Sequence, residues 1–481
     1  MAHADSDLAR LDAVALAALI RSGELSPVEA VQATIDRIEA MDGQLNAVIH
    51  RRFEQALEEA AGDLPEGPFR GVPMMLKDLW PASKGDPFHQ GVKALKEAGH
   101  RADRDSVIAT RYRDAGFVLV GRTNTPELGL SATTEPLSHG PCRNPWNPDH
   151  GTGGSSGGAG AAVASGMLPA ANASDGGGSI RIPAAMCGLV GLKPSRGRMS
   201  MGPLQDEWGV SVQHVVSHSV RDSAAIMDVT CEPTLGDGVI APRIGQPYAD
   251  QVGAEVGRLR IGLWNESPRD GLTLHPECRS SVDQTAALLE SLGHEVAIAH
   301  PEMADNREIP ARFRATSLAG VAGNLRQLGE LLGREVGPDD VEPATWAMAQ
   351  GGLRLSAVDL VDAQSAMHVY RRGMAEWWED GWDLLLTPTT TQPPPKIGEL
   401  ASDPDDPLRG SQRSVPYAAF TSMFNVTGQP AISLPIHRTA DNLPIGVQLV
   451  AAYGREDLLI RVAAQLEAAV DWAKERAPIH A

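Results

Sequence analysis

The chain has 481 residues, 42% hydrophobic and 21% charged, a balance typical of a globular protein with a large buried core. Its formal net charge of −19 argues against nucleic acid or an anionic membrane as a partner, because phosphate groups would repel it. The first ten residues lack the apolar segment of a signal peptide, and no apolar run approaches the roughly 18 residues of a membrane span. We therefore expect a cytoplasmic protein.

The first part of the chain, about residues 1–62, is predicted to be helical. Ser26 and Glu29 flank Pro27 as a capping box, and apolar residues recur at helical spacing after it. A second helix is predicted over Phe53 to Ala61. Next, Val72 to Leu76 has the pattern of a short buried strand.

The remaining elements predict a mixed α/β fold. A strand–helix–strand unit between residues 260 and 298 implies parallel strands, because its crossover is helical. The acidic segment Ala401 to Gly410 is predicted to be a loop, and neither a repeat nor a linker is visible. We expect one domain over residues 1–481, with a central twisted mixed sheet covered by helices on both sides. Further elements are predicted as a helix over 105–115 and strands over 117–120, 382–387, 431–436 and 445–450.

The segment from Gly151 to Pro194 is rich in glycine and carries Ser155 in GGSSGG and Ser179 in DGGGSIR, 24 positions apart (179 − 155). A flexible linker is disfavoured, because apolar residues such as Ile180 follow directly. A phosphate-binding loop of the Walker type is excluded, since no lysine occurs in the segment before Gly191.

Two serines compete as the nucleophile. Ser155 satisfies the GxSxG pattern of a nucleophile elbow, which would make the chain a Ser–His–Asp hydrolase, but the preceding NPWNPDHGTG contains no predicted strand. Ser179 follows Gly176, Gly177 and Gly178, whose successive N–H groups would suit an oxyanion hole. The histidine nearest in sequence is His150, which nothing in the sequence marks as a base.

Metal and cofactor chemistry have no clear signature. Among the 14 histidines only His214 and His218 have HxxxH spacing, and Val215 stands where a zinc protease has its glutamate. The four cysteines form no CxxC pair. We expect no metal and no organic cofactor.

At this point the residues resemble the amidase signature family of serine hydrolases. The blocks GGSSGG and PAANASDGGGSIRIPAAMCGLVGLKPSRGRMS match the family signature, and GVPMMLKD matches its upstream lysine motif. GRTNTPELG, RNPWNPD, WDLLLTPT and FNVTGQPAISLP match further blocks, so the likeness covers essentially the whole chain, with the signature core at about 151–194.

The resemblance implies a Ser–cisSer–Lys triad. Ser179 would attack the carbonyl carbon, Ser155 would follow a cis peptide bond and relay protons, and Lys77 would be the final base. Lys77 must then be neutral, and burial can lower the pKa of a lysine by up to ~3–5 units. Asp175 and Arg181 match signature positions and are expected to orient the glycine loop.

The resemblance also places Gly129, Leu130 and Ser131 at the acyl pocket, and Leu130, with Met75 and Trp80, predicts an apolar substrate. Within the family the chain looks closer to bacterial amidases of the 6-aminohexanoate-cyclic-dimer hydrolase and aryl acylamidase types, which urethanases also resemble. A glutamine amidotransferase A-type subunit is the alternative, although TNTPELGLSATTEP departs from its usual block. The expected activity is amide hydrolysis, extending to carbamates and esters, on a small molecule, and a homodimer is compatible with it.

Overall fold

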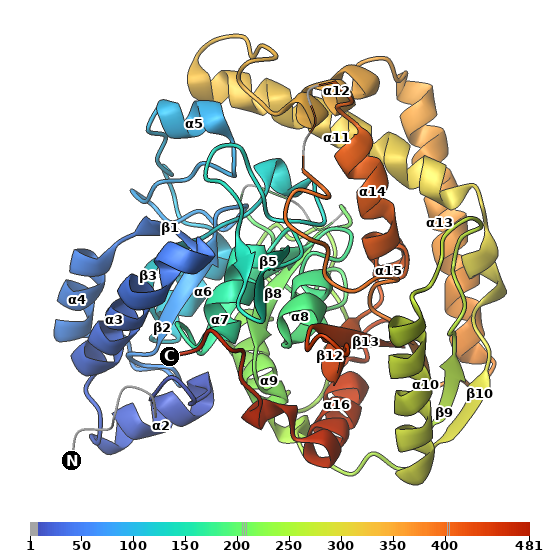
Figure 1. The fold of residues 1–481 in the computed structure, drawn as a ribbon, viewed down its shortest axis with the longest axis horizontal. Helices are drawn as coiled ribbons and strands as arrows, with labels where there is room; N and C mark the ends of the chain where they lie inside the picture. Colours follow the sequence, from blue (N-terminus) through green and yellow to red (C-terminus); the bar gives the residue numbers. More distant parts are fainter. Residues whose placement is uncertain (1–7, 204, 206, 208, 402, 404) are drawn as a thin grey trace.

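The computed structural model describes residues 8–203, 205, 207, 209–401, 403 and 405–481. Its centre is an eight-stranded mixed sheet, and the helices lie on both faces of that sheet (Figure 1). In spatial order its strands are β10 (Glu295–Ile298), β9 (Arg260–Leu263), β11 (Leu384–Pro388), β13 (Pro444–Ala451), β12 (Ala431–Arg438), β7 (Val190–Lys193), β8 (Val212–Ser217) and β6 (Ala170–Asp175).

The sheet has a parallel part and an antiparallel part. β10, β9 and β11 are parallel to one another, with Ile261 opposite both Val296 and Leu384. From β11 to β6 every neighbouring pair is antiparallel. The predicted strand–helix–strand unit is confirmed as β9, α10 (Pro276–Ser291) and β10, since β9 and β10 pair in parallel.

Alternating residues of the central strands enter different cores, because successive side chains of a strand point to opposite faces. Leu384 and Leu386 pack with α9 (Val220–Thr230), α10 and α16 (Glu456–Val470). Leu385 packs on the other face with α13 (Ala357–Glu379) and α15 (Ser422–Thr427). The predicted sheet with helices on both faces is confirmed.

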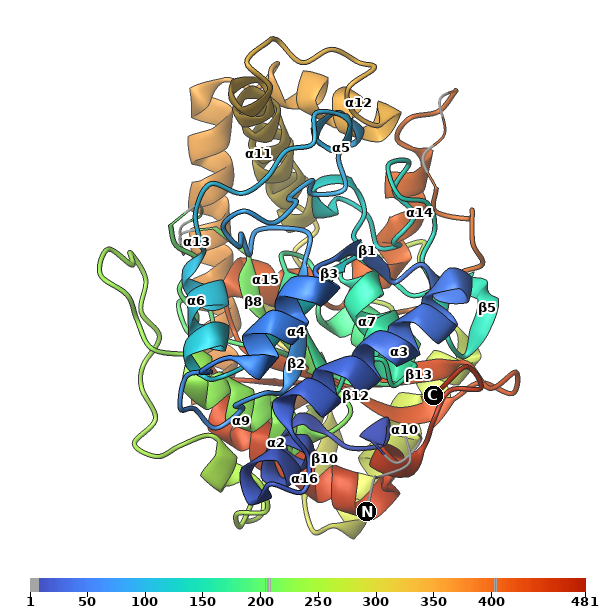
Figure 2. The same ribbon diagram turned by 90° about the vertical axis from the view of Figure 1, so that its left-hand side faces the viewer.

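A second, three-stranded sheet lies beside the edge strand β6. Its order is β1 (Val48–Arg51), β3 (Val118–Thr123), β2 (Pro73–Lys77), and β2 packs against β6. Helices α2 (Ala13–Ser22), α3 (Pro27–Leu45), α4 (Phe53–Ala61) and α6 (Val107–Asp114) cover this region, and α3 and α4 cross in front of the sheet in Figure 2. The predicted capping box at Ser26 and the helix over 53–61 are confirmed.

The glycine-rich segment forms the interior joint between the two sheets. It contains α7 (Gly157–Ala164), β6, α8 (Arg181–Cys187) and β7, and all residues of α7 and α8 are buried. Gly158 shows why glycine is needed, since an added Cβ would lie 2.3 Å from the backbone nitrogen of Asn124. The glycines therefore let α7 pack directly on backbone.

The remaining helices form one end of the molecule. In Figure 1 α5 (Lys93–Glu97), α11 (Ile309–Leu332) and α12 (Pro343–Gly352) lie together at the top, and α14 (Arg409–Ala418) lies beside them. The segment predicted to be a loop, residues 401–410, overlaps the start of α14 at Arg409 and Gly410. Within the described residues no helix is both long and apolar enough to cross a membrane.

Candidate active site

Lys77 and Ser155, far apart in sequence, meet in the interior. Lys77 ends β2, and its Nζ lies 2.7 Å from Ser155 Oγ and 3.0 Å from Ser174 Oγ. Lys77 is fully buried and Ser155 is 2% exposed. The peptide bond between Gly154 and Ser155 is cis. The amine of Lys77 is therefore hydrogen bonded to the hydroxyl of Ser155.

The surroundings of Lys77 favour its neutral form. Burial lowers the pKa of Lys77 well below its usual value, and the charge of Asp175 opposes this shift only in part. A neutral amine has a lone pair and can take a proton from a hydroxyl. Lys77 therefore has the electrostatic setting of a base, as expected from its sequence position beside apolar residues.

Ser179 lies at the entrance of α8 and is half-buried. Among the described residues its hydroxyl has no hydrogen-bond partner, so the structure does not itself join Ser179 to Ser155. An added Cβ on Gly177 would meet no atom within 4 Å, so space is open beside the loop. The N–H of Gly178 already donates to Asp175 Oδ1 at 2.7 Å, whereas that of Gly177 has no acceptor in the described part of the chain.

Asp175 and Arg181 form a buried ion pair that contacts the glycine loop. Arg181 Nε and Nη2 donate to the two oxygens of Asp175, each at 2.9 Å, and both side chains are completely buried. The same carboxylate accepts from the backbone N–H of Gly178 and Ile180. Burial alone would raise the pKa of Asp175, but Arg181 outweighs this and lowers it to about 2. The expectation that this pair orients the loop is confirmed by these contacts.

The C-terminal part of the chain completes this support. Arg181 also donates to Gln448 Oε1 at 2.7 Å and to Asn425 Oδ1 at 2.6 Å. Thr421 donates through its hydroxyl to the carbonyl of Gly177 at 2.6 Å. The glycine loop is thus fixed by residues some 240 to 270 positions away.

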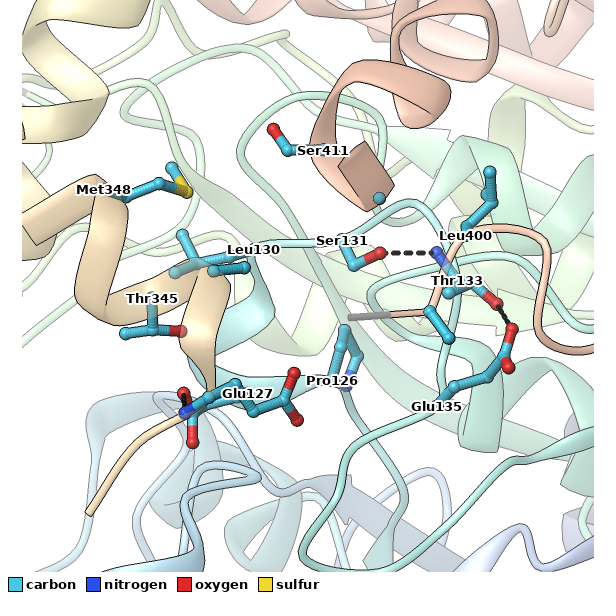
Figure 3. A pocket seen from close by; sticks show the side chains of 14 residues that line it. Pro126, Glu127, Leu130, Ser131, Thr133, Glu135, Thr345, Met348, Leu400 and Ser411 are labelled. Atoms are coloured by element: carbon cyan, nitrogen blue, oxygen red, sulfur yellow. Dashed lines mark hydrogen bonds between the residues drawn. The ribbon is translucent and has the colours of Figure 1, made fainter. Parts of the chain in front are cut away.

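The segment around Gly129 packs directly against Ser155. Gly129 has a φ of +70°, and an added Cβ would lie 3.1 Å from Ser155 Oγ. On the other side of the same segment, Leu130 and Ser131 line a pocket, whereas Gly129 does not (Figure 3). The three residues predicted at the acyl pocket are therefore together, although Lys77, Ser155 and Ser179 are not among the residues that line this pocket.

The pocket is lined by both apolar and polar residues. Figure 3 shows Thr345 and Met348 of α12 on one side, the segment from Pro126 to Glu135 beside them, and Ser411 of α14 opposite. Met75, expected near the substrate, is instead completely buried in the core formed with α3 and α7. The pocket has three carboxyl groups among its lining residues, namely those of Glu127, Glu135 and Glu342.

The carboxyl group of Glu127, which lines this pocket, has a raised pKa. Burial, together with the charge of Glu342, raises the pKa of Glu127 to about 8. Its Oε1 accepts a hydrogen bond from the backbone N–H of Glu342 at 2.7 Å. At neutral pH the carboxyl of Glu127 is therefore protonated and can donate a hydrogen bond.

The Ser–His–Asp alternative requires a strand before Ser155 and a histidine hydrogen bonded to the nucleophile. The expectation that no strand precedes Ser155 was wrong, because β5 (Asn147–Gly151) lies there, paired with β4 (Arg143–Asn144) and bridged through His150 to Lys396. However, His150 Nδ1 lies 2.8 Å from the carbonyl oxygen of Pro394. Within the described residues no histidine ring hydrogen bonds with Ser155 or Ser179.

The HxxxH pair is structural. His214 lies in β8 with Nε2 3.0 Å from Ser223 Oγ, and His218 Nε2 lies 2.8 Å from the carbonyl oxygen of Val163. Burial lowers the pKa of both imidazoles to about 3. The two rings are held by separate partners and do not form a metal pair.

Sequence reasoning missed two contacts of Lys77. Its Nζ donates to Ser174, and its backbone N–H donates to Asn172 Oδ1 at 3.3 Å. The signal was present, because positions 172 and 174 of a strand point to the same face. The roles of Gln448 and Glu127 had no comparable signal in the sequence.

Comparison with known proteins agrees with this geometry. The amidase family model matches residues 29–460. The 6-aminohexanoate-cyclic-dimer hydrolase of Paenarthrobacter ureafaciens is 45% identical over 474 residues, which cover 97% of this chain and 96% of the relative.

Two solved structures extend the likeness to the fold. That of a 6-aminohexanoate cyclic dimer hydrolase complexed with substrate has a TM-score of 0.95 at 44% identity, covering 98% of this chain and 99% of the other. A bacterial aryl acylamidase has a TM-score of 0.86 at 27% identity, covering 98% and 100%. The chain therefore belongs to the amidase signature family and is an enzyme that hydrolyses amide bonds.

Proposed function

We propose that this enzyme cleaves the C–N bond of a small amide through an acyl intermediate on Ser179, with Ser155 and Lys77 as the proton relay. The hydrogen bond of 2.7 Å between Lys77 Nζ and Ser155 Oγ is the observation that carries the proposal. It gives Ser155 a base that burial keeps neutral.

In the first half-reaction, Ser179 Oγ forms a bond to the carbonyl carbon and its proton passes to Ser155, whose own proton passes to Lys77. The negative charge that develops on the carbonyl oxygen would be stabilised by the N–H groups of the Gly176–Gly178 loop. Since Gly178 already donates to Asp175, we assign the larger share to Gly177 and to the N–H of Ser179.

The same relay then runs in reverse. Lys77 returns a proton through Ser155 to the leaving nitrogen, because an amine leaves readily only when it is protonated. Water replaces the amine, gives up a proton to the relay, and forms a bond to the acyl carbon. The bond to Ser179 Oγ breaks, the acid departs, and the three residues regain their starting protonation.

The substrate class follows from the pocket and the relatives. We propose a short aliphatic amide, such as a linear or cyclic 6-aminohexanoate oligomer, with its methylene chain along Leu130 and Met348 and polar groups near Ser131 and Glu127. A carbamate presents the same trigonal carbonyl carbon to Ser179, so urethane hydrolysis is included in the proposal. Transfer of ammonia from glutamine to another acceptor is the competing function.

The test is hydrolysis of a panel by the purified chain and by two serine variants. The panel contains a short-chain p-nitroanilide, linear and cyclic 6-aminohexanoate dimers, an aryl carbamate and glutamine. Ser179→Ala should lose activity by about 10⁴-fold or more, as for other catalytic nucleophiles. Ser165→Ala is the control, because the hydroxyl of Ser165, the residue after α7, donates to carbonyl oxygens of that helix, those of Ala161 and Ala162.

The outcomes separate the alternatives. Release of amine that is retained in Ser165→Ala and lost in Ser179→Ala supports the proposal and ranks the substrates. Turnover of glutamine alone would favour the amidotransferase subunit. Full activity of Ser179→Ala would refute the nucleophile.

A further inference from the structure

Four side chains that can ligate a metal ion lie close together near the end of β2, the strand that carries Lys77. They are His50 of β1, Asp78 directly after β2, His89 in the loop before α5, and His139 in the loop before β4. One ligand atom of each lies within 4.8 Å of the ligand atoms of the other three. Their positions in sequence have no spacing motif, so only the fold reveals the group.

These side chains have polar atoms that the protein does not satisfy. His50 Nε2, Asp78 Oδ2, His89 Nδ1 and His139 Nε2 are all buried without a hydrogen-bond partner in the described structure. His50 Nε2 and Asp78 Oδ2 are 3.8 Å apart, which is too long for a hydrogen bond. Asp78 is completely buried, and an unpartnered carboxylate oxygen in such a place is costly.

The ring geometry brings the imidazoles around a common point. The His50 ring is nearly perpendicular to those of His89 and His139, with centroids 4.4 and 5.5 Å away. In the described structure each of the three rings has a nitrogen without a hydrogen bond, which can ligate a metal ion.

We propose that His50, Asp78, His89 and His139 bind one divalent transition-metal ion, with Zn²⁺ as the best match. Three imidazole nitrogens and one carboxylate oxygen are donors that Zn²⁺ accepts in a tetrahedral arrangement. Bonds of about 2.0–2.2 Å would require each ligand atom to move inward by less than about 1 Å. Asp78 is already held in part, since its Oδ1 accepts the backbone N–H of His89 at 3.1 Å.

Two cations oppose the metal and limit its affinity. Arg122 is buried and acts on Asp78, and Lys96 acts on His89 and His139. Both have their own anchors, because Arg122 donates to Pro81 O at 2.8 Å and Lys96 donates to Ser138 O. The Asp78 carboxylate is the one acidic group of the ligand set and would attract the ion.

A bound ion would cross-link four segments that lie far apart in the sequence. Asp78 follows Lys77 directly, so the ion would fix the end of the strand that presents the base. This role is structural and independent of how Ser179 and Ser155 react.

The experiment measures metal on the full chain without a polyhistidine tag. Protein stripped with a chelator is equilibrated with Zn²⁺, and bound zinc is counted by mass spectrometry of the elements. The visible spectrum after Co²⁺ loading reports the coordination number. Thermal unfolding with and without Zn²⁺ reports coupling to the fold, because a ligand of the folded state raises the melting temperature.

His50→Ala and His139→Ala test the ligands, and His368→Ala is the matched control because His368 is exposed on α13. We expect one zinc per chain in the unmodified protein and the control, a four-coordinate Co²⁺ spectrum, and affinity at least about tenfold weaker in both test variants. Circular dichroism establishes folding, and His139→Gln replaces His139→Ala if the alanine variant is unfolded.

Less than a tenth of an equivalent of zinc on the unmodified protein would overturn the proposal. So would one equivalent bound equally by the unmodified chain and all variants, which would locate the metal elsewhere. No substrate is used, so these results are separate from the test of the amidase mechanism.

Discussion

Lys77 Nζ and Ser155 Oγ are 2.7 Å apart in a part of the protein that solvent does not reach. The contact joins the end of β2 to the turn before α7, and Ser174 of β6 accepts from the same nitrogen. In the proposed mechanism, Lys77 exchanges protons with the substrate through Ser155. Burial favours the neutral amine, so the stability of the fold also depends on the protonation of Lys77.

Replacing this lysine should remove its contribution to the pH dependence of stability. Between the lowered pKa of folded Lys77 and its usual pKa of 10.5, the unfolded chain binds one proton more than the folded chain. The free energy of unfolding of the unmodified protein should therefore rise with pH relative to Lys77→Met, by about 1.4 kcal/mol per pH unit within this window. Denaturant unfolding at pH 7, 8 and 9 measures the difference, and activity should fall by about 10²–10⁴-fold.

The control for this prediction is Lys84→Met, because Lys84 is exposed. Its unfolding free energy should follow that of the unmodified protein at every pH. Parallel curves for Lys77→Met and the unmodified protein would show that Lys77 is charged in the folded state.

Two glycine-to-alanine variants should distinguish the effect of a contact with Ser155 from the effect of backbone strain. In Gly129→Ala the new Cβ would lie 2.6 Å from Leu79 Cδ2 and 3.1 Å from Ser155 Oγ, so Leu79 must move and Ser155 must give way by a few tenths of an ångström. Gly23→Ala has a similar positive φ of +77° but meets nothing within 4 Å. Both variants should lose about 1 kcal/mol of stability, whereas only Gly129→Ala should lower kcat, by about tenfold or more. Equal kcat values in the two variants would show that the segment does not position Ser155.

The pocket carboxyl should make substrate binding depend on pH. Glu127 is protonated below a pKa of about 8 and becomes charged above it. For an uncharged amide that accepts a hydrogen bond from this group, KM should rise as the pH passes through 8. In Glu127→Gln, which keeps a donor and cannot ionise, KM should stay constant over the same range.

Stability gives a second readout for Glu127. From its usual value of 4.5 to about 8 the folded chain holds a proton that the unfolded chain has lost. The free energy of unfolding therefore falls with rising pH in this window, and Glu127→Gln should lack this loss. Glu135→Gln lines the same pocket and serves as control, so it should keep the pH dependence of KM seen in the unmodified protein. A flat KM in the unmodified protein would remove Glu127 from the binding site.

Local features of the fold could be predicted because they depend on neighbouring residues. The capping box at Ser26, the helix over 53–61 and the strand ending at Lys77 each follow from a few adjacent side chains. Repeated glycines and the family likeness indicated Lys77, Ser155 and Ser179. Periodicity also located the strands at 431–438 and 444–451, although not the neighbours with which they pair.

The contacts that the sequence could not predict are long-range. Gln448 reaches Arg181 only because β13 lies in the middle of the sheet. The raised pKa of Glu127 depends on burial and, in addition, on the charge of Glu342, the residue that precedes α12. The group around Asp78 has members in four segments, so no linear spacing describes it.

The order of strands sets a constraint on how the protein can be made. β12 and β13 are the last two strands to leave the ribosome, yet they fill the gap between β11 and β7. Until they emerge, the growing chain has two half-sheets with open apolar edges, each able to pair with another chain. Arg181 also lacks Gln448 until then. Nascent chains that end before about residue 450 should therefore be inactive and prone to aggregate, and cellular yield should depend on chaperones that protect these edges during synthesis.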